Sequence, residues 1–247
     1  MGLQYDTAKT ANLYSTFPET FRIRERTNWQ RHPVPGDLKP LVAVPTTIGT
    51  GSETTGVAIF DFKDIGAKTG IAHRSLRPDV GLVDPENTRL LPKMVAACSA
   101  FDVLCHGIDL HSSALFTTTA PPTPAHPPAY QGSNPISDVW ALAALDLVGN
   151  NILNAVLDDD DNARSNMALA ATFAGVGFGN AGVHLPHGMS YPVSSLVKKY
   201  RPDGYPEENA IVPHGMAVIL NAPAVFRYTA HSNPERHIHA ADFWVPM

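Results

Sequence analysis

The pattern of apolar and polar residues changes character near residue 90. Before this point the apolar runs are short and rich in β-branched residues, which predicts buried strands. A segment rich in helix formers precedes them and predicts a helix at about residues 6–14. The predicted strands are residues 41–45, 57–62, 67–72 and 80–83. The first part of the chain is therefore predicted to be α/β.

Beyond this change, apolar residues recur at helical spacing. The pattern predicts helices over residues 94–113, 136–157 and 162–178, the last of them rich in alanine. Residues 120–128 carry several prolines and interrupt the pattern. Because proline cannot continue a helix or a central strand, this segment is predicted to be a surface loop. The second part of the chain is therefore predicted to be mainly helical.

The composition of the chain excludes or disfavours several classes of protein. The chain has 247 residues, of which 44% are hydrophobic and 17% charged, so it can bury a sizeable core and is not intrinsically disordered. The absence of an apolar run of 18 residues argues against a membrane span. The net charge of −5, without a long basic block, argues against a nucleic-acid partner. Two cysteines cannot form a disulfide scaffold, which favours a reducing compartment.

Two kinds of segment carry candidate chemistry. Residues 46–53, rich in Thr, Gly and Ser, follow the first strand directly, as phosphate-binding turns often do. Asp102 and His106 stand four apart in an apolar helical stretch, so they share one face and can bind one divalent cation. Taken alone, such a pair is more often a surface hydrogen bond. Its apolar surroundings favour a metal, because buried ionisable groups need a partner.

Further histidines in apolar settings complete a possible ligand set. His184 and His187 lie close together in the sequence, and His214 follows later. One carboxylate and three imidazoles would bind Fe(II) or Zn(II) and leave a position open for a substrate oxygen. Sequence spacing does not show whether these side chains converge.

Four ordered segments give the chain a resemblance to a known family. Residues 45–53 are similar to a PTTxGTGSE signature, residues 101–106 to a DxxxH ligand pair, and residues 179–192 and 212–215 to two further ligand segments. Together they resemble the iron-containing, or group III, alcohol dehydrogenases. Residues 129–135 and the Gly-Met-Ser-Tyr-Pro run favour the mitochondrial hydroxyacid-oxoacid transhydrogenase branch of that family.

The resemblance implies a set of metal ligands that are also the catalytic residues. These are Asp102, His106, His187 and His214. His184 is then a neighbour of the site, and Tyr191 stands where many family members have a further histidine. The remaining histidines are expected to be ordinary surface or loop residues: His32, His73, His111, His126, His231, His237 and His239.

The resemblance also implies a nicotinamide cofactor, NAD(H), beside the metal, which would be iron or zinc. The residues expected to contact the cofactor are Asp6, Thr46, Thr47, Thr50, Ser52 and Lys68. The family's glycine-rich segment is absent before Asp6, and its long helical stretch after His214 is cut short. The chain is therefore expected to be truncated at both ends.

The implied fold is that of the dehydroquinate synthase-like iron alcohol dehydrogenases. Residues 1–89 would form an α/β remnant, which is an incomplete dinucleotide-binding domain. Residues 90–247 would form a mainly α-helical metal-binding catalytic domain whose C-terminal part is missing.

The implied function is oxidation of 4-hydroxybutyrate to succinate semialdehyde, coupled to reduction of 2-oxoglutarate to 2-hydroxyglutarate in the mitochondrion. The partners would be these small hydroxy and oxo acids, while self-association is left open. By charge alone, Lys198, Lys199 and Arg201 are candidates to bind the substrate carboxylate, although a solvated surface run is the more common interpretation. The alternatives are an inactive metal-binding fragment, a general NAD-dependent alcohol dehydrogenase, or an interaction module that uses the proline-rich segment.

Overall fold

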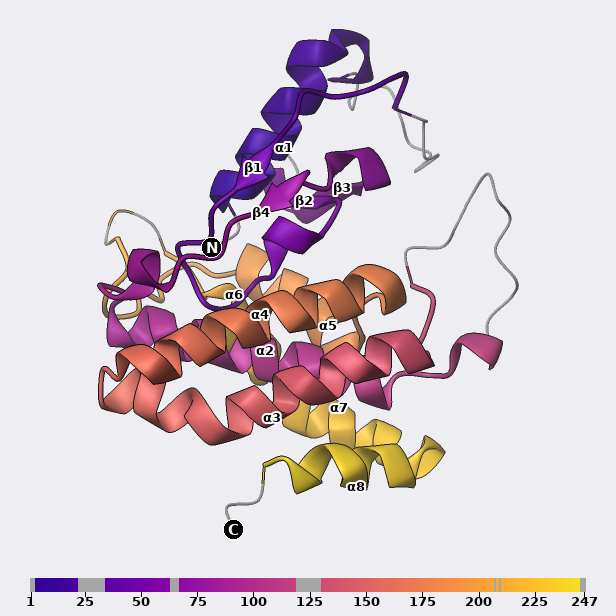
Figure 1. The fold of residues 1–247 in the computed structure, drawn as a ribbon, viewed down its shortest axis with the longest axis vertical. Coiled ribbons are helices and arrows are strands. Elements are labelled where there is room, and N and C mark those ends of the chain that lie inside the picture. Colours follow the sequence, from indigo (N-terminus) through magenta and orange to yellow (C-terminus); the bar gives the residue numbers. More distant parts are fainter. Residues whose placement is uncertain are drawn as a thin grey trace.

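A computed structural model describes residues 3–21, 34–62, 67–118, 130–206, 208 and 210–244. Long helices form the body of the molecule, with α1 and the strands on one side and α7 and α8 on the other (Figure 1). The predicted proline-rich loop, residues 120–128, lies outside the described residues.

The N-terminal part contains one helix and two small sheets. The hairpin is confirmed: β2 and β3 are antiparallel, and Val57 lies opposite Ala72. The other two predicted strands are confirmed but are only two residues long, and β1 pairs with β4 in parallel. The elements are α1 (Leu3–Thr16), β1 (Val42–Ala43), β2 (Val57–Phe62), β3 (Ala67–Ala72) and β4 (Val80–Gly81).

Short 3₁₀ turns connect these elements and some of the later helices. They are η1 (Pro18–Phe21), η3 (Ser52–Thr54), η5 (Arg74–Leu76), η6 (Pro85–Thr88), η7 (Phe116–Thr118) and η8 (Ala230–Ser232).

Three long helices build the core and were all predicted from the sequence: α2 (Lys93–Ser112), α3 (Pro135–Leu157) and α4 (Asp161–Ala181). Side-chain caps fix the starts of α3 and α4, since Asn134 accepts the backbone N–H of Ser137 and Asp160 accepts that of Ala163. Small residues dominate the buried faces of α3 and α4 and allow the two helices to pack closely.

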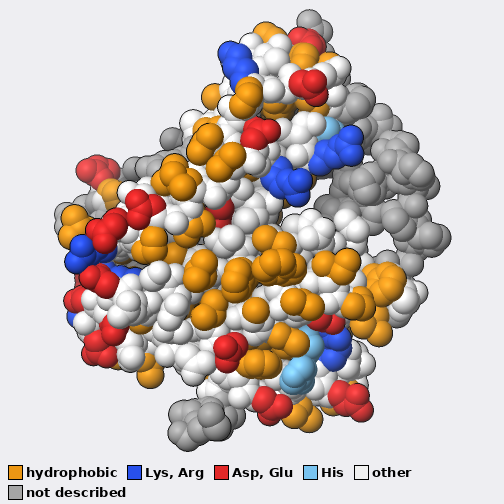
Figure 2. Space-filling model, in the orientation of Figure 1, with side chains coloured by type: hydrophobic (Ala, Val, Ile, Leu, Met, Phe, Trp, Pro, Cys, Tyr) orange, Lys and Arg blue, Asp and Glu red, His pale blue; other side chains and the backbone are white. Residues whose placement is uncertain are grey.

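Apolar side chains also gather on the outer face over α3 and α4 (Figure 2). Within the described residues, α3 is long and apolar enough to cross a membrane, and α4 with α5 would qualify only as a pair bent by 105°. The core helices of globular proteins share this property. Helix α3 packs along both α2 and α4, and 33% of its apolar stretch is buried in this fold.

Four shorter helices complete the fold: α5 (Leu185–Ser195), α6 (His214–Ile219), α7 (Ala222–Thr229) and α8 (Pro234–Asp242). Both α5 and α6 contact α2. The contact of α6 with α2 requires glycine, because a Cβ on Gly215 would lie 1.8 Å from the carbonyl oxygen of Cys98.

The loop that follows β1 is fixed against the long helices. Ile48 is fully buried in the core cluster that these helices form. Gly51 adopts a left-handed conformation (φ 56°), and its Cα lies so close to α4 that an added Cβ would be 2.7 Å from the Cα of Gly175. Glycine at both positions therefore lets the loop rest on α4.

One expectation about the histidines is wrong. His111 is buried rather than exposed, and its Nδ1 lies 3.3 Å from Asp138 Oδ1. Arg236 of α8 donates to the same carboxylate oxygen, and His239 Nδ1 lies 3.2 Å from His111 Nε2. The cause is the docking of α8 against α2, which brings together residues more than 120 positions apart.

Candidate metal centre

The candidate centre lies where α5 and α6 meet α2. Asp102 and His106 stand one turn apart on α2, and both are buried because helices surround α2. His187 lies in the first turn of α5 and is also buried. His214 is the first residue of α6. Three helices therefore supply the four predicted ligands.

The structure brings these side chains together. One ligand atom from each of Asp102, His106 and His187 lies within 4.8 Å of the other two. His187 Nε2 is 3.4 Å from Asp102 Oδ1, and His214 Nε2 is 3.5 Å from the same oxygen. Both His187 and His214 thus approach Asp102 Oδ1.

The chemistry of this cluster fits a divalent metal ion. Within the described part of the chain, Asp102 Oδ1, His106 Nδ1 and His187 Nε2 are buried atoms without a hydrogen-bond partner. Buried polar atoms left in this way cost free energy, unless another group satisfies them. A carboxylate with imidazole nitrogens is a donor set that both Fe(II) and Zn(II) accept.

Burial and charge hold most of the cluster in the protonation state that a metal requires. Burial disfavours the ionised form of Asp102 and acts to raise its pKa. The positive charges of the nearby histidines have the larger effect and keep the pKa of Asp102 well below its usual value. Burial lowers the pKa of His106 to about 3 and that of His214 to about 4. At neutral pH the carboxylate is therefore ionised and these two imidazoles are neutral.

His187 is the exception. Burial acts to lower its pKa, but the carboxylates of Asp102 and Asp109 raise it to about 9. Asp109 Oδ2 lies 2.6 Å from His187 Nδ1, so the ring is held from the side opposite Asp102. Sequence analysis missed Asp109, although its position seven residues after Asp102 on one helix places it on the same face.

Solvent reaches the cluster from the side of His214. Its side chain is 28% exposed, whereas those of Asp102 and His187 are 3% and 5% exposed. His106 is closed off by ring contacts, with Phe178 4.4 Å and His187 4.3 Å from its centroid. A substrate would therefore approach from the His214 side.

The two neighbouring residues singled out by the sequence have distinct places. His184 precedes α5, and its backbone N–H donates to Asp109 Oδ2, so it lies beside the cluster without joining it. Burial, with the nearby charge of Asp6, raises the pKa of Tyr191, which keeps the phenol protonated. Tyr191 is therefore close to the N-terminal part of the chain.

The expected cofactor residues fall in two places. Thr46 is exposed and Thr47, Thr50 and Ser52 are half-buried in the loop that rests on α4. Lys68 lies on β3, where its backbone N–H donates to Ser195 of α5, and its positive charge acts on the pKa of His214. Among these residues, Lys68 is therefore the one that the structure links to His214.

Asp6 differs from the other expected cofactor residues because it is buried. Burial raises the pKa of its carboxyl group, whereas the positive charges of Lys9 and Lys68 act to lower this pKa. Lys9 is fully buried and donates to the carbonyl oxygens of Ser52 and Val57, at 2.8 Å each. This lysine ties α1 to the end of the loop.

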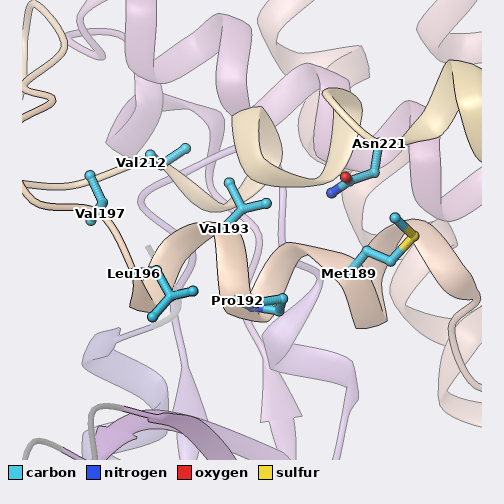
Figure 3. A pocket seen from close by; sticks show the side chains of 7 residues that line it. All are labelled: Met189, Pro192, Val193, Leu196, Val197, Val212 and Asn221. Carbon is cyan, nitrogen blue, oxygen red and sulfur yellow. The ribbon is translucent and has the colours of Figure 1, made fainter.

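An apolar groove of 470 Å³ lies between α5 and the residues on either side of α6 (Figure 3). It is lined by Met189, Pro192, Val193, Leu196, Val197, Val212 and Asn221. Since His187 faces α2 instead, the groove lies outside the cluster. The basic candidates for substrate binding, Lys198, Lys199 and Arg201, are exposed beyond the end of α5.

Two family models match the chain. The model described as iron-containing alcohol dehydrogenase matches residues 2–85, and the one described as the C-terminal part of the Fe-containing alcohol dehydrogenase family matches residues 129–244. The chain belongs to the iron-containing alcohol dehydrogenase family. Members of this family are metal-dependent oxidoreductases.

Similar proteins have been curated in animals. The chain is 51% identical to the mitochondrial hydroxyacid-oxoacid transhydrogenase of Bos taurus, over 98% of this chain and 53% of that protein. It is 50% identical to the human protein of the same name, with the same coverage. The chain therefore spans about half the length of the curated relatives it matches.

A solved structure supports the family fold. An iron-containing alcohol dehydrogenase from Thermococcus thioreducens superimposes with a TM-score of 0.78 at 28% identity, covering 98% of this chain and 57% of that one. The fold class expected from the resemblance is confirmed.

Proposed function

We propose that this chain carries the metal centre and part of the nicotinamide site of a mitochondrial hydroxyacid-oxoacid transhydrogenase. The observation that carries the proposal is the buried cluster of Asp102, His106 and His187, together with His214, whose Nε2 lies 3.5 Å from Asp102 Oδ1. The similarity to relatives of that name supports the choice of reaction and compartment.

These four residues would hold iron or zinc. When bound, such an ion supplies Lewis acidity toward a substrate hydroxyl or carbonyl oxygen. The chain's own contribution is to keep Asp102 ionised and His106 and His214 neutral at neutral pH, and to shield the cluster from water except beside His214.

The cofactor in this proposal is NAD(H). The loop residues Thr46, Thr47, Thr50 and Ser52 would bind its polar groups, and Lys68 would lie between the cofactor and His214. The support is positional, since the loop is fixed on α4 and β3 is fastened to α5. Asp6 would act from a buried position beside Lys68.

The reaction proposed is a balanced exchange of two electrons. The hydroxyl-bearing carbon of 4-hydroxybutyrate loses a hydride and the hydroxyl loses a proton, which gives succinate semialdehyde. The carbonyl carbon of 2-oxoglutarate gains a hydride and its oxygen a proton, which gives 2-hydroxyglutarate. The nicotinamide carries the hydride between them and ends unchanged.

The test is turnover by the purified chain loaded with Fe(II) or Zn(II). We expect 2-hydroxyglutarate to form only when both acids are present, and His187→Ala to abolish the product. His231→Ala, at an exposed histidine outside the cluster, is the matched control and should retain activity. Metal uptake without product would overturn the proposal in favour of a metal-binding chain without catalysis. Oxidation that consumes free NAD without an oxo acid would favour a general alcohol dehydrogenase.

A further inference from the structure

Asp109 lies on α2 just beyond the candidate ligands. It follows His106 by three residues and Asp102 by seven, so all three occupy the same face of the helix. Its side chain is fully buried, and Oδ2 lies 2.6 Å from His187 Nδ1. The same oxygen accepts the backbone N–H of His184 at 3.3 Å.

The burial of this carboxylate calls for an explanation. A buried carboxylate is costly, unless hydrogen bonds or a partner charge offset the loss of hydration. Within the described residues, the ion pair of Asp109 is made with the imidazole of His187, and Oδ1 has no hydrogen-bond partner. The strongest contact of Asp109 is therefore its contact with His187.

That contact decides which nitrogen of His187 faces the cluster. Because Nδ1–H donates to Asp109, Nε2 is the atom turned toward Asp102 Oδ1, at 3.4 Å. Histidines that bind metals commonly donate their other N–H to a carboxylate, which fixes the ring and makes the ligating nitrogen more basic.

We propose that Asp109 is a positioning residue that orients His187 and strengthens its hold on a divalent ion. This inference rests on the metal centre proposed above. The rival explanation is that Asp109 only fastens the start of α5 to α2 through the N–H of His184. The substitution Asp109→Asn distinguishes the two explanations. Asparagine keeps an oxygen that can accept the N–H of His184, but it removes the negative charge beside His187.

The experiment is a titration of the metal-free chain with Co(II), followed by its visible absorption. We expect Asp109→Asn to weaken Co(II) binding about tenfold and Asp109→Ala up to about a hundredfold. The matched control is Asp138→Asn, which alters another, partly buried aspartate–histidine pair, that with His111, outside the cluster. Its Co(II) affinity and spectrum should equal those of the wild type.

A second measurement on the wild type does not depend on how the variants fold. In the Zn(II)-loaded chain, ¹⁵N NMR of the histidine rings should show a proton on His187 Nδ1 and the metal on Nε2. The opposite arrangement would overturn the proposal, as would unchanged Co(II) affinity in a folded Asp109→Asn. If Asp102→Ala loses Co(II) binding while Asp109→Asn keeps wild-type affinity, the proposed metal centre is supported and only the role of Asp109 is contradicted. Failure of the wild type to bind Co(II) would remove both.

Discussion

At the scale of single residues, His187 differs from the other candidate ligands in its protonation. Near pH 7 the other three have the protonation that a metal requires, whereas the two carboxylates that flank His187 stabilise its charged form. A cation therefore competes with one proton, bound to the nitrogen that faces Asp102.

This competition predicts that metal uptake releases protons. With a pKa of about 9, His187 is protonated at pH 7.5, so binding of Zn(II) should release about one proton, and the apparent affinity should rise about tenfold per pH unit up to pH 9. Titration calorimetry in two buffers of different ionisation enthalpy measures this number. Release of two or three protons, or of none, would contradict the protonation states described here.

The sequence predicted which residues lie together better than it predicted their surroundings. Asp102, His106, His187 and His214 could be chosen as candidate ligands because their segments resemble a family; the first three lie in one cluster and His214 is 3.5 Å from Asp102. Asp109 was missed because its partner lies 78 residues away, and His111 was misplaced because Arg236 and His239 reach it only through the docking of α8. Contacts between distant helices leave no local pattern.

At the scale of elements, the centre depends on how closely α6 approaches α2. An alanine at position 215 would place a methyl group 1.8 Å from Cys98 O and 3.0 Å from Asp102 Cβ. The backbone carbonyl of Cys98 cannot rotate away as a flexible side chain can, so α6 and His214 would have to shift.

Gly215→Ala should therefore weaken both folding and metal binding. We expect a loss of about 1–3 kcal/mol in the free energy of unfolding, as for other overpacked sites, together with weaker Zn(II) binding. Denaturant unfolding and chelator competition measure the two effects. Gly188→Ala is the matched control, because a Cβ at this position, next to His187, meets nothing within 4 Å. Equal behaviour of the two variants would show that α6 is not held as described.

A second element-scale prediction concerns the buried Lys9. Lys9→Met removes the donor to Ser52 and Val57, and the lost hydrogen bonds should lower the free energy of unfolding by about 2 kcal/mol. Denaturant unfolding tests this, with the exposed Lys39→Met as the control that should change little.

Lys9 also determines the direction in which the free energy of unfolding changes with pH. Burial lowers its pKa to about 8, below the value of 10.5 in the unfolded chain. Between these values the unfolded state binds a proton that the folded state has lost, so Lys9 stabilises the fold increasingly as pH rises from 8 to 10.5. The stability difference between wild type and Lys9→Met should grow over this interval, and a constant difference would contradict the burial of this amine.

Periodicity predicted the long elements, whereas the short strands were predicted without their exact bounds and helix α6 was not predicted. The helices α2, α3 and α4 and the hairpin of β2 and β3 each carry a repeating pattern over several turns or residues. Helix α6 has six residues, too few to display a period, and its position is set by the contact of Gly215 with α2. The strands β1 and β4 are held by one parallel pairing and are too short to be bounded from sequence.

At the scale of the whole molecule, a bound ion would join three helices. Its ligands come from α2, α5 and α6, and α5 is also fastened to β3 through Ser195 and Lys68. Metal binding should therefore stabilise parts of the chain that are far apart in sequence.

Loading with Zn(II) should accordingly raise the melting temperature, and removal by a chelator should reverse the rise. At a free concentration of a hundred times Kd, the expected stabilisation is about 2.7 kcal/mol. Hydrogen exchange should slow more in α5 and α6, which the ion would join to α2, than in α3, which supplies no ligand. Uniform protection of all helices would contradict a localised centre.

The claim on which the others depend is that one divalent ion is bound jointly by Asp102, His106, His187 and His214. Crystals of the Zn(II)-loaded chain, measured on both sides of the zinc absorption edge, test it most directly. We expect a single anomalous peak about 2.0–2.2 Å from one atom of each of these side chains. A chain that folds as described but shows its peak elsewhere, or none at this cluster, would contradict joint binding by these four residues.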